Sequence, residues 1–177
     1  MKNLEFKAQI REPKSLESIF TQNGAVFTAL LRQSDTYFNV SRGRLKLREA
    51  DGRRVELVFY ERDESSSSGM RSIYDIFPVA DLKLKDFLAK ALGVKVVVEK
   101  ERRLLKLRNA RIHLDEVSGL GDFLEFEVVF TPDEQGKADD EADVALLELL
   151  KGYAAPFVVR EIRQSYSDLM VEKLSPG

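Results

Sequence analysis

The stretch that constrains the fold most lies near the N-terminus, where apolar and polar side chains alternate strictly. Every second residue from Leu4 to Ile10 is apolar, and the residues between them are polar. Because successive side chains of a strand point to opposite faces of a sheet, this pattern predicts a strand over Asn3–Ile10. One face of this strand is apolar and the other is polar and partly charged. The fold must therefore provide a suitable environment for both faces.

The rest of the chain predicts an antiparallel arrangement of about eight strands. Helical patterns interrupt the strands at three points, near Pro13, Asp81 and Asp143, and a short helical tail follows the last strand. Strands joined mainly by short turns favour an antiparallel barrel or sandwich with attached helices over a doubly wound parallel sheet. The length suits one mainly β, α+β domain over residues 1–177. The predicted strands are Asn3–Ile10, Ala25–Tyr37, Arg44–Glu49, Val55–Arg62, Ser72–Val79, Lys95–Leu107, Ala110–Val117, Phe123–Phe130 and a last short one near Phe157–Ile162.

Composition excludes several classes of function. The 28 Lys and Arg residues nearly balance the 30 Asp and Glu residues, so we expect no general attraction to a nucleic acid polymer or an anionic membrane. The absence of cysteine excludes disulfides, thiolate zinc sites and a cysteine nucleophile. His113 is the single histidine, which excludes a histidine-based zinc site or catalytic triad and is interpreted as a structural strand residue. Without a signal-like segment or a run of about 18 apolar residues, the sequence predicts a cytoplasmic protein.

Charges of one sign gather on single faces of the predicted strands. Solvated outer faces would explain any one of these sets, since antiparallel sheets commonly keep one face wet. A surface that serves only solubility would mix the two signs, so the segregation favours a charged interior instead. Three sets carry a single sign, namely Arg44 with Lys46 and Arg48, Lys100 with Arg102, and Glu125 with Glu127, whereas the N-terminal strand presents Glu5 and Lys7, one charge of each sign.

A charged barrel interior of this kind suits one class of ligand. Basic side chains can neutralise a polyphosphate while carboxylates hold the Mg²⁺ or Mn²⁺ that bridges its oxygens. Enclosing several cations is unfavourable unless the space holds water or an anionic ligand. The sequence therefore predicts a site for a polyphosphate and a divalent metal.

Short motifs along nearly the whole chain resemble those of a known family. Leu4–Ala8 resembles the last part of a Glu-x-Glu-x-Lys signature, and further blocks follow it in the family's order. The chain thereby resembles the CYTH superfamily of triphosphate tunnel enzymes, which includes class IV adenylyl cyclases and thiamine triphosphatases. The further blocks are Asp35–Phe38, Gly43–Glu49, Glu99–Arg102, Ile112–Asp115, Gly119–Glu127 and Ser165–Leu169.

The resemblance implies an eight-stranded antiparallel β-barrel tunnel with peripheral helices, a homodimer, and a role for each charged residue. The implied catalytic residues are Glu5, Lys7, Lys100 and Arg102. The implied ligands of Mg²⁺ or Mn²⁺ are Glu5, Glu125 and Glu127, with Asp115 as a helper. The implied phosphate-binding residues are Lys7, Lys46, Arg48, Lys100 and Arg102, and Arg62 and Arg71 fall where the family places further basic residues.

Two positions depart from the family pattern. Asn3 stands where the signature has its first glutamate, and Glu61 stands where cyclase-like members often carry a lysine. Replacing a carboxylate by an amide keeps hydrogen-bonding capacity but removes a full charge from the metal site. Weak activity, a different metal preference and loss of activity are all compatible with Asn3.

The leading hypothesis is a metal-dependent enzyme that hydrolyses the terminal phosphate of tripolyphosphate, ATP or thiamine triphosphate. A class IV adenylyl cyclase, which forms cyclic AMP and pyrophosphate from ATP, is the close alternative because the same tunnel serves both reactions. A non-catalytic module that binds polyphosphate or nucleotides is a rival, and Asn3 is the residue that supports it. An interaction protein with all charges on its outer surface is a further rival.

Overall fold

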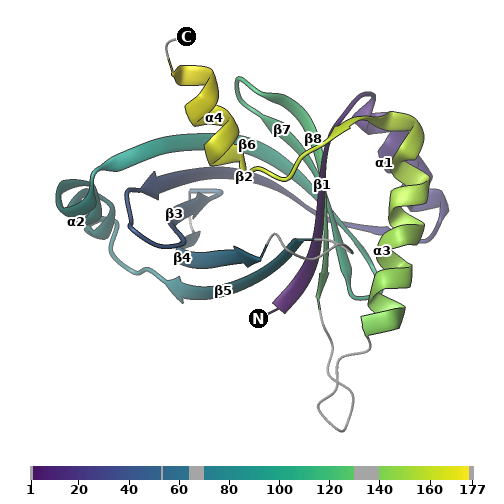
Figure 1. The fold of residues 1–177 in the computed structure, drawn as a ribbon, viewed down its shortest axis with the longest axis horizontal. Coiled ribbons are helices and arrows are strands. Elements are labelled where there is room, and N and C mark those ends of the chain that lie inside the picture. Colours follow the sequence, from purple (N-terminus) through teal and green to yellow (C-terminus); the bar gives the residue numbers. More distant parts are fainter. Residues whose placement is uncertain (1, 53, 64–69, 130–139, 176–177) are drawn as a thin grey trace, which may run out of the picture.

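The computed structural model describes residues 2–52, 54–63, 70–129 and 140–175. These residues form nine antiparallel strands, four α-helices and one short 3₁₀ helix over Ala155–Phe157 (Figure 1). The strands are β1 (Lys2–Ile10), β2 (Val26–Phe38), β3 (Arg44–Ala50), β4 (Arg54–Asp63), β5 (Met70–Pro78), β6 (Val94–Leu107), β7 (Ala110–Val117), β8 (Gly121–Val129) and β9 (Val158–Glu161). The helices are α1 (Pro13–Gln22), α2 (Lys83–Leu92), α3 (Asp140–Ala154) and α4 (Tyr166–Leu174).

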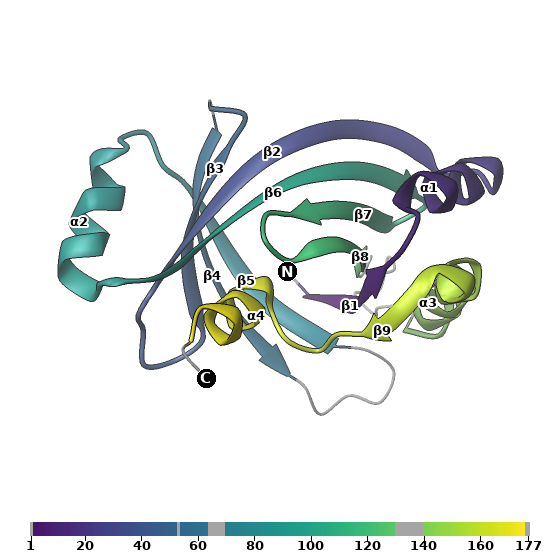
Figure 2. The same cartoon turned by 90° about the horizontal axis from the view of Figure 1, so that it is seen from above.

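Eight of the strands follow one another around a tunnel in the order β5, β4, β3, β2, β6, β7, β8, β1. Residues 2–5 of β1 pair with β5, so the order returns to its first strand. The predicted eight-stranded antiparallel tunnel is confirmed, and Figure 2 shows β2 and β6 curving along its wall. The last predicted strand forms β9, a ninth strand that pairs with residues 8–10 of β1 rather than joining the ring.

The apolar faces of β1, β7 and β8 point outward, where α1 and α3 cover them. Figure 1 shows these two helices side by side on one flank of the barrel. Phe126 of β8 is fully buried, and its ring contacts Phe6 of β1 and Phe20 of α1 at centroid distances of 5.7 and 5.6 Å. Burial of each such side chain contributes about 1.5–3 kcal/mol. Because the main apolar core lies outside the barrel wall, the charged faces of these strands point into the tunnel.

A second apolar cluster lies at one end of the tunnel, beneath α4. Val98 and Phe123 alternate in phase with the charged tunnel residues and pack against Tyr166 and Met170 of α4. A capping box begins this helix, because the Ser165 side chain accepts a hydrogen bond from the Asp168 N–H and the Asp168 carboxylate accepts one from the Ser165 N–H. The C-terminal helix thereby covers this end of the tunnel.

The remaining helices are peripheral. The longest, α3, has 15 residues, and α2 has ten residues with none of them buried. Helix α2 begins at Lys83 with Leu82 at the N-cap, one residue after the predicted cap Asp81, whose carboxylate still accepts a hydrogen bond from the Lys83 N–H at 2.9 Å. Lys85 of α2 pairs with Glu49 of β3 at 2.5 Å. Within the described ranges, no helix combines the length and apolarity needed to cross a membrane.

Candidate functional site

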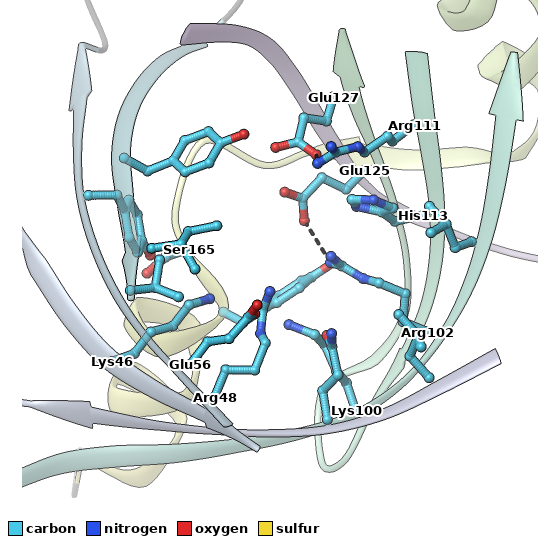
Figure 3. A pocket seen from close by; sticks show the side chains of 18 of the residues that line it. Lys46, Arg48, Glu56, Lys100, Arg102, Arg111, His113, Glu125, Glu127 and Ser165 are labelled. Atoms are coloured by element: carbon cyan, nitrogen blue, oxygen red, sulfur yellow. Dashed lines mark hydrogen bonds and ion pairs between the residues drawn. The ribbon is translucent and has the colours of Figure 1, made fainter. Parts of the chain in front are cut away.

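A cavity of about 370 Å³ occupies the tunnel interior, and in the described part of the chain charged side chains from six of the eight strands of the ring line it (Figure 3). Among the described side chains, eight cations face four carboxylates, so the lining carries a formal excess of four positive charges when its histidine is neutral. Such an excess favours a multiply charged anion. The cations are Lys7, Lys46, Arg48, Arg54, Lys100, Arg102, Lys106 and Arg111, and the carboxylates are Glu5, Glu56, Glu125 and Glu127.

The structure brings most of the predicted site residues to this one cavity. Asp115 is not among the residues that line the cavity. Arg44 does not line it either, and its guanidinium lies 2.8 Å from the carboxylate of Asp168 in α4. The side chains of Asn3, Arg62 and Arg71 lie outside the part of the chain that the structure describes. The predicted residues that line the cavity are Glu5, Lys7, Lys46, Arg48, Lys100, Arg102, Glu125 and Glu127.

Three of the predicted phosphate-binding cations converge on Asp35 of β2. Its carboxylate accepts hydrogen bonds from Lys46 Nζ at 2.9 Å and Lys100 Nζ at 3.2 Å. Arg48 donates two more, from Nε at 2.8 Å and from a terminal nitrogen at 2.9 Å. Complete burial works to raise the pKa of Asp35, but the three cations together lower that pKa well below its usual value. Asp35 is therefore an ionised acid enclosed by cations.

Burial also changes the two lysines of this group. Desolvation lowers the pKa of Lys100 to about 8, with Arg102 and Arg48 acting in the same direction and Asp35 against them. Desolvation likewise lowers the pKa of Lys46 well below its usual value, and neighbouring Arg48 lowers it further. Asp35 acts against burial at both lysines, because its negative charge raises their pKa values and so favours their charged forms.

Arg102 is held in a separate arrangement by Asp115 of β7. Two hydrogen bonds, at 2.7 and 2.6 Å, join the guanidinium to both carboxylate oxygens. The Tyr166 hydroxyl donates a third hydrogen bond to the same carboxylate at 2.8 Å. A terminal nitrogen of Arg102 also reaches Glu125 at 3.3 Å. Both oxygens of Asp115 are thus engaged, which favours a role in holding Arg102 over the helper role in metal binding that the sequence implied.

Three glutamates gather on the neighbouring strands β1 and β8. Glu5 and Glu127 are directly opposite each other in the strand pairing, and Glu125 follows on the same face. Like charges directly opposite each other destabilise a sheet unless a cation compensates them. Arg111 Nη1 lies 3.2 Å from Glu127 Oε2, and Lys7 Nζ lies 3.8 Å from Glu125 Oε2. Part of the negative charge of the glutamates is therefore balanced within the protein.

The donor chemistry of these glutamates fits a hard divalent cation. Mg²⁺ and Mn²⁺ prefer carboxylate oxygens, and Glu5, Glu125 and Glu127 all face one cavity. Within the described ranges, no three Asp, Glu or His side chains already approach one another as a preformed metal cluster. Binding of an ion would therefore require these side chains to draw together.

The sequence did not assign His113, or the cations Arg54, Lys106 and Arg111, to the site. His113 lies on β7, the strand between β6 and β8, and lines the cavity. Its Nδ1 atom has no hydrogen-bond partner among the described residues. Burial, with Arg102 next in effect, lowers the pKa of His113 to about 3, so its ring is neutral at pH 7. Lys106 and Arg111 follow the same alternation as Arg102 and His113. Extending the two-residue period along each strand would have identified them.

Comparisons with known proteins find one matching family model and several solved structures of the same fold. A model of the CYTH domain matches residues 1–165. The PH1012 protein from Pyrococcus horikoshii OT3 superposes with a TM-score of 0.74 at 23% identity, covering 94% of this chain and 98% of that chain. A putative adenylate cyclase from Vibrio parahaemolyticus gives 0.68 at 17% identity, over 95% and 97% of the two chains. No curated protein shows significant sequence similarity.

Another protein of the same fold is described with both reactions in its name. HpAC1 from Hippeastrum is described as a putative adenylyl cyclase with a dominant triphosphatase activity. It superposes with a TM-score of 0.64 at 14% identity, over 99% of this chain and 97% of that chain. At these identities the structural similarities establish the fold, and the specific reaction has to be argued from the residues of this chain.

Proposed function

The chain belongs to the CYTH domain family, and we propose that it is a metal-dependent triphosphatase whose tunnel binds a triphosphate-containing small molecule. The observation that carries this proposal is a cavity whose lining has a formal excess of four positive charges, which is two when the buried carboxylates Asp35 and Asp115 that contact it are included, and which also presents neighbouring glutamates. An anion with several phosphate groups neutralises the cations, and a divalent metal neutralises the glutamates. Tripolyphosphate, ATP and thiamine triphosphate are the substrates of this class that we propose to test.

We assign the binding of the phosphates to cations that already have fixed positions. Lys46, Arg48 and Lys100 are held by Asp35 on one side of the cavity, and Figure 3 shows Glu125 and Glu127 on the opposite side. Ionised donors form shorter and stronger hydrogen bonds to phosphate oxygens than neutral donors do. Because these donor side chains are largely buried, their attraction for phosphate is stronger than it would be in bulk water.

Glu5, Glu125 and Glu127 are the residues that would hold Mg²⁺ or Mn²⁺. When bound, such an ion would polarise a phosphoryl oxygen and neutralise part of the charge on the triphosphate.

The chain's own contribution to hydrolysis is the placement and stabilisation of charge. A water molecule forms a bond to the terminal phosphorus while the bond from that phosphorus to the bridging oxygen breaks. The diphosphate part departs with the electron pair, the water proton passes to solvent, and the water oxygen remains in the phosphate that is released. Charge spreads over the oxygens of the transferred group, where Lys7, Lys100 and Arg102 can stabilise it. Arg102 presents a fixed guanidinium plane because Asp115 holds one of its edges. The cover formed by α4 limits the access of bulk water from one end.

Adenylyl cyclisation is a second candidate, because the apolar part of the same cavity suits an organic triphosphate such as ATP, as it also would for hydrolysis of ATP or thiamine triphosphate. Leu31, Leu104 and Ile76 line the cavity together with the charged residues. They give the organic part of a nucleoside triphosphate an apolar surface, which inorganic tripolyphosphate does not need. In cyclisation the 3′-hydroxyl of ATP would attack the α-phosphorus and pyrophosphate would leave.

One assay separates these reactions. The protein is incubated with Mg²⁺ or Mn²⁺ and with tripolyphosphate, thiamine triphosphate or ATP, and phosphate, pyrophosphate and cyclic AMP are measured. Phosphate release that is lost in Glu127→Gln but kept in Glu116→Gln, a change on the exposed face of β7, would support the triphosphatase. Cyclic AMP with equimolar pyrophosphate would support the cyclase instead. Binding without any product, in wild type and in Asn3→Glu, would reject both reactions and leave a binding module.

A further inference from the structure

An aspartate stands at the centre of the proposed phosphate-binding cations, where a negative charge competes with the phosphates. Asp35 has no exposed side-chain surface, and its two oxygens accept all four of the hydrogen bonds described above. A carboxylate offers about four acceptor positions, so Asp35 is saturated by Lys46, Arg48 and Lys100. The group of four side chains keeps a formal charge of +2. It therefore still attracts an anion.

We propose that Asp35 is a positioning residue that keeps Lys46, Arg48 and Lys100 charged and aligned for the phosphates. This inference rests on the proposed function, because it concerns the same tunnel. The three cations come from two strands, β3 and β6, which flank β2 on its two sides. Asp35 of β2 lies directly opposite Arg48 in the pairing with β3. A single buried carboxylate on the central strand can therefore orient cations from both neighbouring strands.

The geometry explains why these cations need an internal partner. Lys100 and Lys46 have side-chain exposures of 2% and 9%, so neither ammonium group is well hydrated. A buried lysine without a nearby negative charge loses its proton readily. A neutral lysine would bind phosphate weakly. Besides Asp35, the titratable and charged groups that face the two lysines are Tyr37, Arg48, Tyr60, Arg102, Asp115 and Tyr166.

The sign of the expected pH effect follows from this arrangement. Asp35 acts to raise the pKa of both lysines against the effect of burial, so removing its charge lowers both pKa values. The protonated lysines bind the phosphates, and therefore phosphate binding in the variant is lost at a lower pH than in the wild type. At a pH below both pKa values the lysines stay charged, and the loss of a competing negative charge leaves binding unchanged or tighter.

The experiment measures the affinity of wild type and Asp35→Asn for inorganic tripolyphosphate by calorimetry in metal-free buffer. Measurements are made at about pH 6.5 and about pH 8.5, on either side of the pKa of about 8 for Lys100. We expect the variant to bind about tenfold or more weakly than the wild type at the higher pH, and this difference to shrink at the lower pH. Protonation of tripolyphosphate also changes with pH, but it changes equally for both proteins. It therefore does not affect the ratio of their affinities at each pH. Asp122→Asn, which removes a carboxylate from the outward face of β8, should match the wild type at both values.

Three results would overturn the proposal or its premise in distinguishable ways. Equal affinities of wild type and Asp35→Asn at both pH values would show that Asp35 does not act through the lysines. An equal loss at both values would show a merely structural role. A wild type that does not bind tripolyphosphate would reject the proposed function itself.

A second pair of variants keeps the test decisive if Asp35→Asn does not fold. Lys46→Met alone retains Asp35 beside Lys100, whereas Asp35→Asn with Lys46→Met removes one charge of each sign and relieves the repulsion among the cations. We expect the double variant to lose binding at a lower pH than Lys46→Met does, because only Lys46→Met still pairs Lys100 with Asp35. Identical pH profiles for these two variants would overturn the proposal.

Discussion

Arg102 and Asp115 lie directly opposite each other on β6 and β7 and are joined by two hydrogen bonds of 2.7 and 2.6 Å. The side-chain exposures of this pair are 9% and 0%. A planar guanidinium and a carboxylate match each other in this two-bond geometry, which fixes orientation as well as distance. Asp115 thereby fixes the direction in which Arg102 points toward Glu125 and the cavity.

Asp115→Asn should lower the free energy of unfolding by about 3 kcal/mol, because it leaves the charge of Arg102 buried without its full partner. Denaturant unfolding of the metal-free protein measures this difference. Glu116→Gln changes the next residue on β7, whose side chain is exposed, and should cost no more than about 0.5 kcal/mol. A loss below about 1 kcal/mol for Asp115→Asn would contradict the importance of the pair.

Glu127→Gln should weaken Mn²⁺ binding by about tenfold, because it removes one of the two carboxylates that face each other across β1 and β8. Binding is measured by calorimetry and by the rise in melting temperature with added Mn²⁺. The control is again Glu116→Gln on the outer face of β7. If Glu127→Gln and wild type show the same rise, the assignment of Glu127 as a metal ligand is wrong.

The two-residue alternation accounts for much of what the sequence predicted correctly. It predicted β7 with the bounds Ala110–Val117 that the structure shows, and it placed Lys100 and Arg102 on the tunnel face. These features depend on neighbours within one strand, which the sequence displays directly. The family motifs added the ring of eight strands, because alternation alone leaves a barrel and a sandwich equally possible.

The relationships that the sequence did not predict depend on strand register and on distant segments. Asp35 was part of a recognised motif, but its role requires β3 and β6 to bring their cations to the same side of β2. The engagement of Asp115 depends on Tyr166, which lies 51 residues further along the chain in α4. The position of β9 depends on which edge of β1 remains unpaired. None of these follows from a local pattern.

Acid should destabilise the metal-free protein partly through His113. The pKa of His113 is about 3 in the folded protein, because of burial and then Arg102, against 6.5 for an ordinary histidine. Between these values the unfolded chain binds a proton that the folded protein does not, so stability falls as the pH falls from about 6.5 toward about 3. The contribution is up to about 1.4 kcal/mol per pH unit.

The matching variant for this prediction is His113→Gln, which cannot take up that proton. Its free energy of unfolding in denaturant should fall less steeply with acid than that of the wild type, with other titrating groups common to both proteins. Parallel pH dependences for the two proteins would show that His113 is not buried in its neutral form.

Tyr166→Phe tests how α4 is held over the end of the tunnel. The Tyr166 ring lies 5.1 Å from the Phe123 ring and 4.3 Å from Lys7 Nζ, and both contacts survive the loss of the hydroxyl. The hydrogen bond to Asp115 is lost, and the free energy of unfolding should fall by about 1 kcal/mol. Tyr166→Ala removes the ring contacts as well and should cost about 3–5 kcal/mol.

The control for Tyr166→Phe is Tyr153→Phe on α3, a half-buried tyrosine away from the tunnel, which should change stability by no more than about 0.5 kcal/mol. Denaturant unfolding measures all three variants. Equal, small effects of Tyr166→Phe and Tyr166→Ala would mean that α4 is not anchored through this residue. A large difference between them would locate the anchoring in the aromatic ring, with the hydroxyl serving mainly to orient Asp115 toward Arg102.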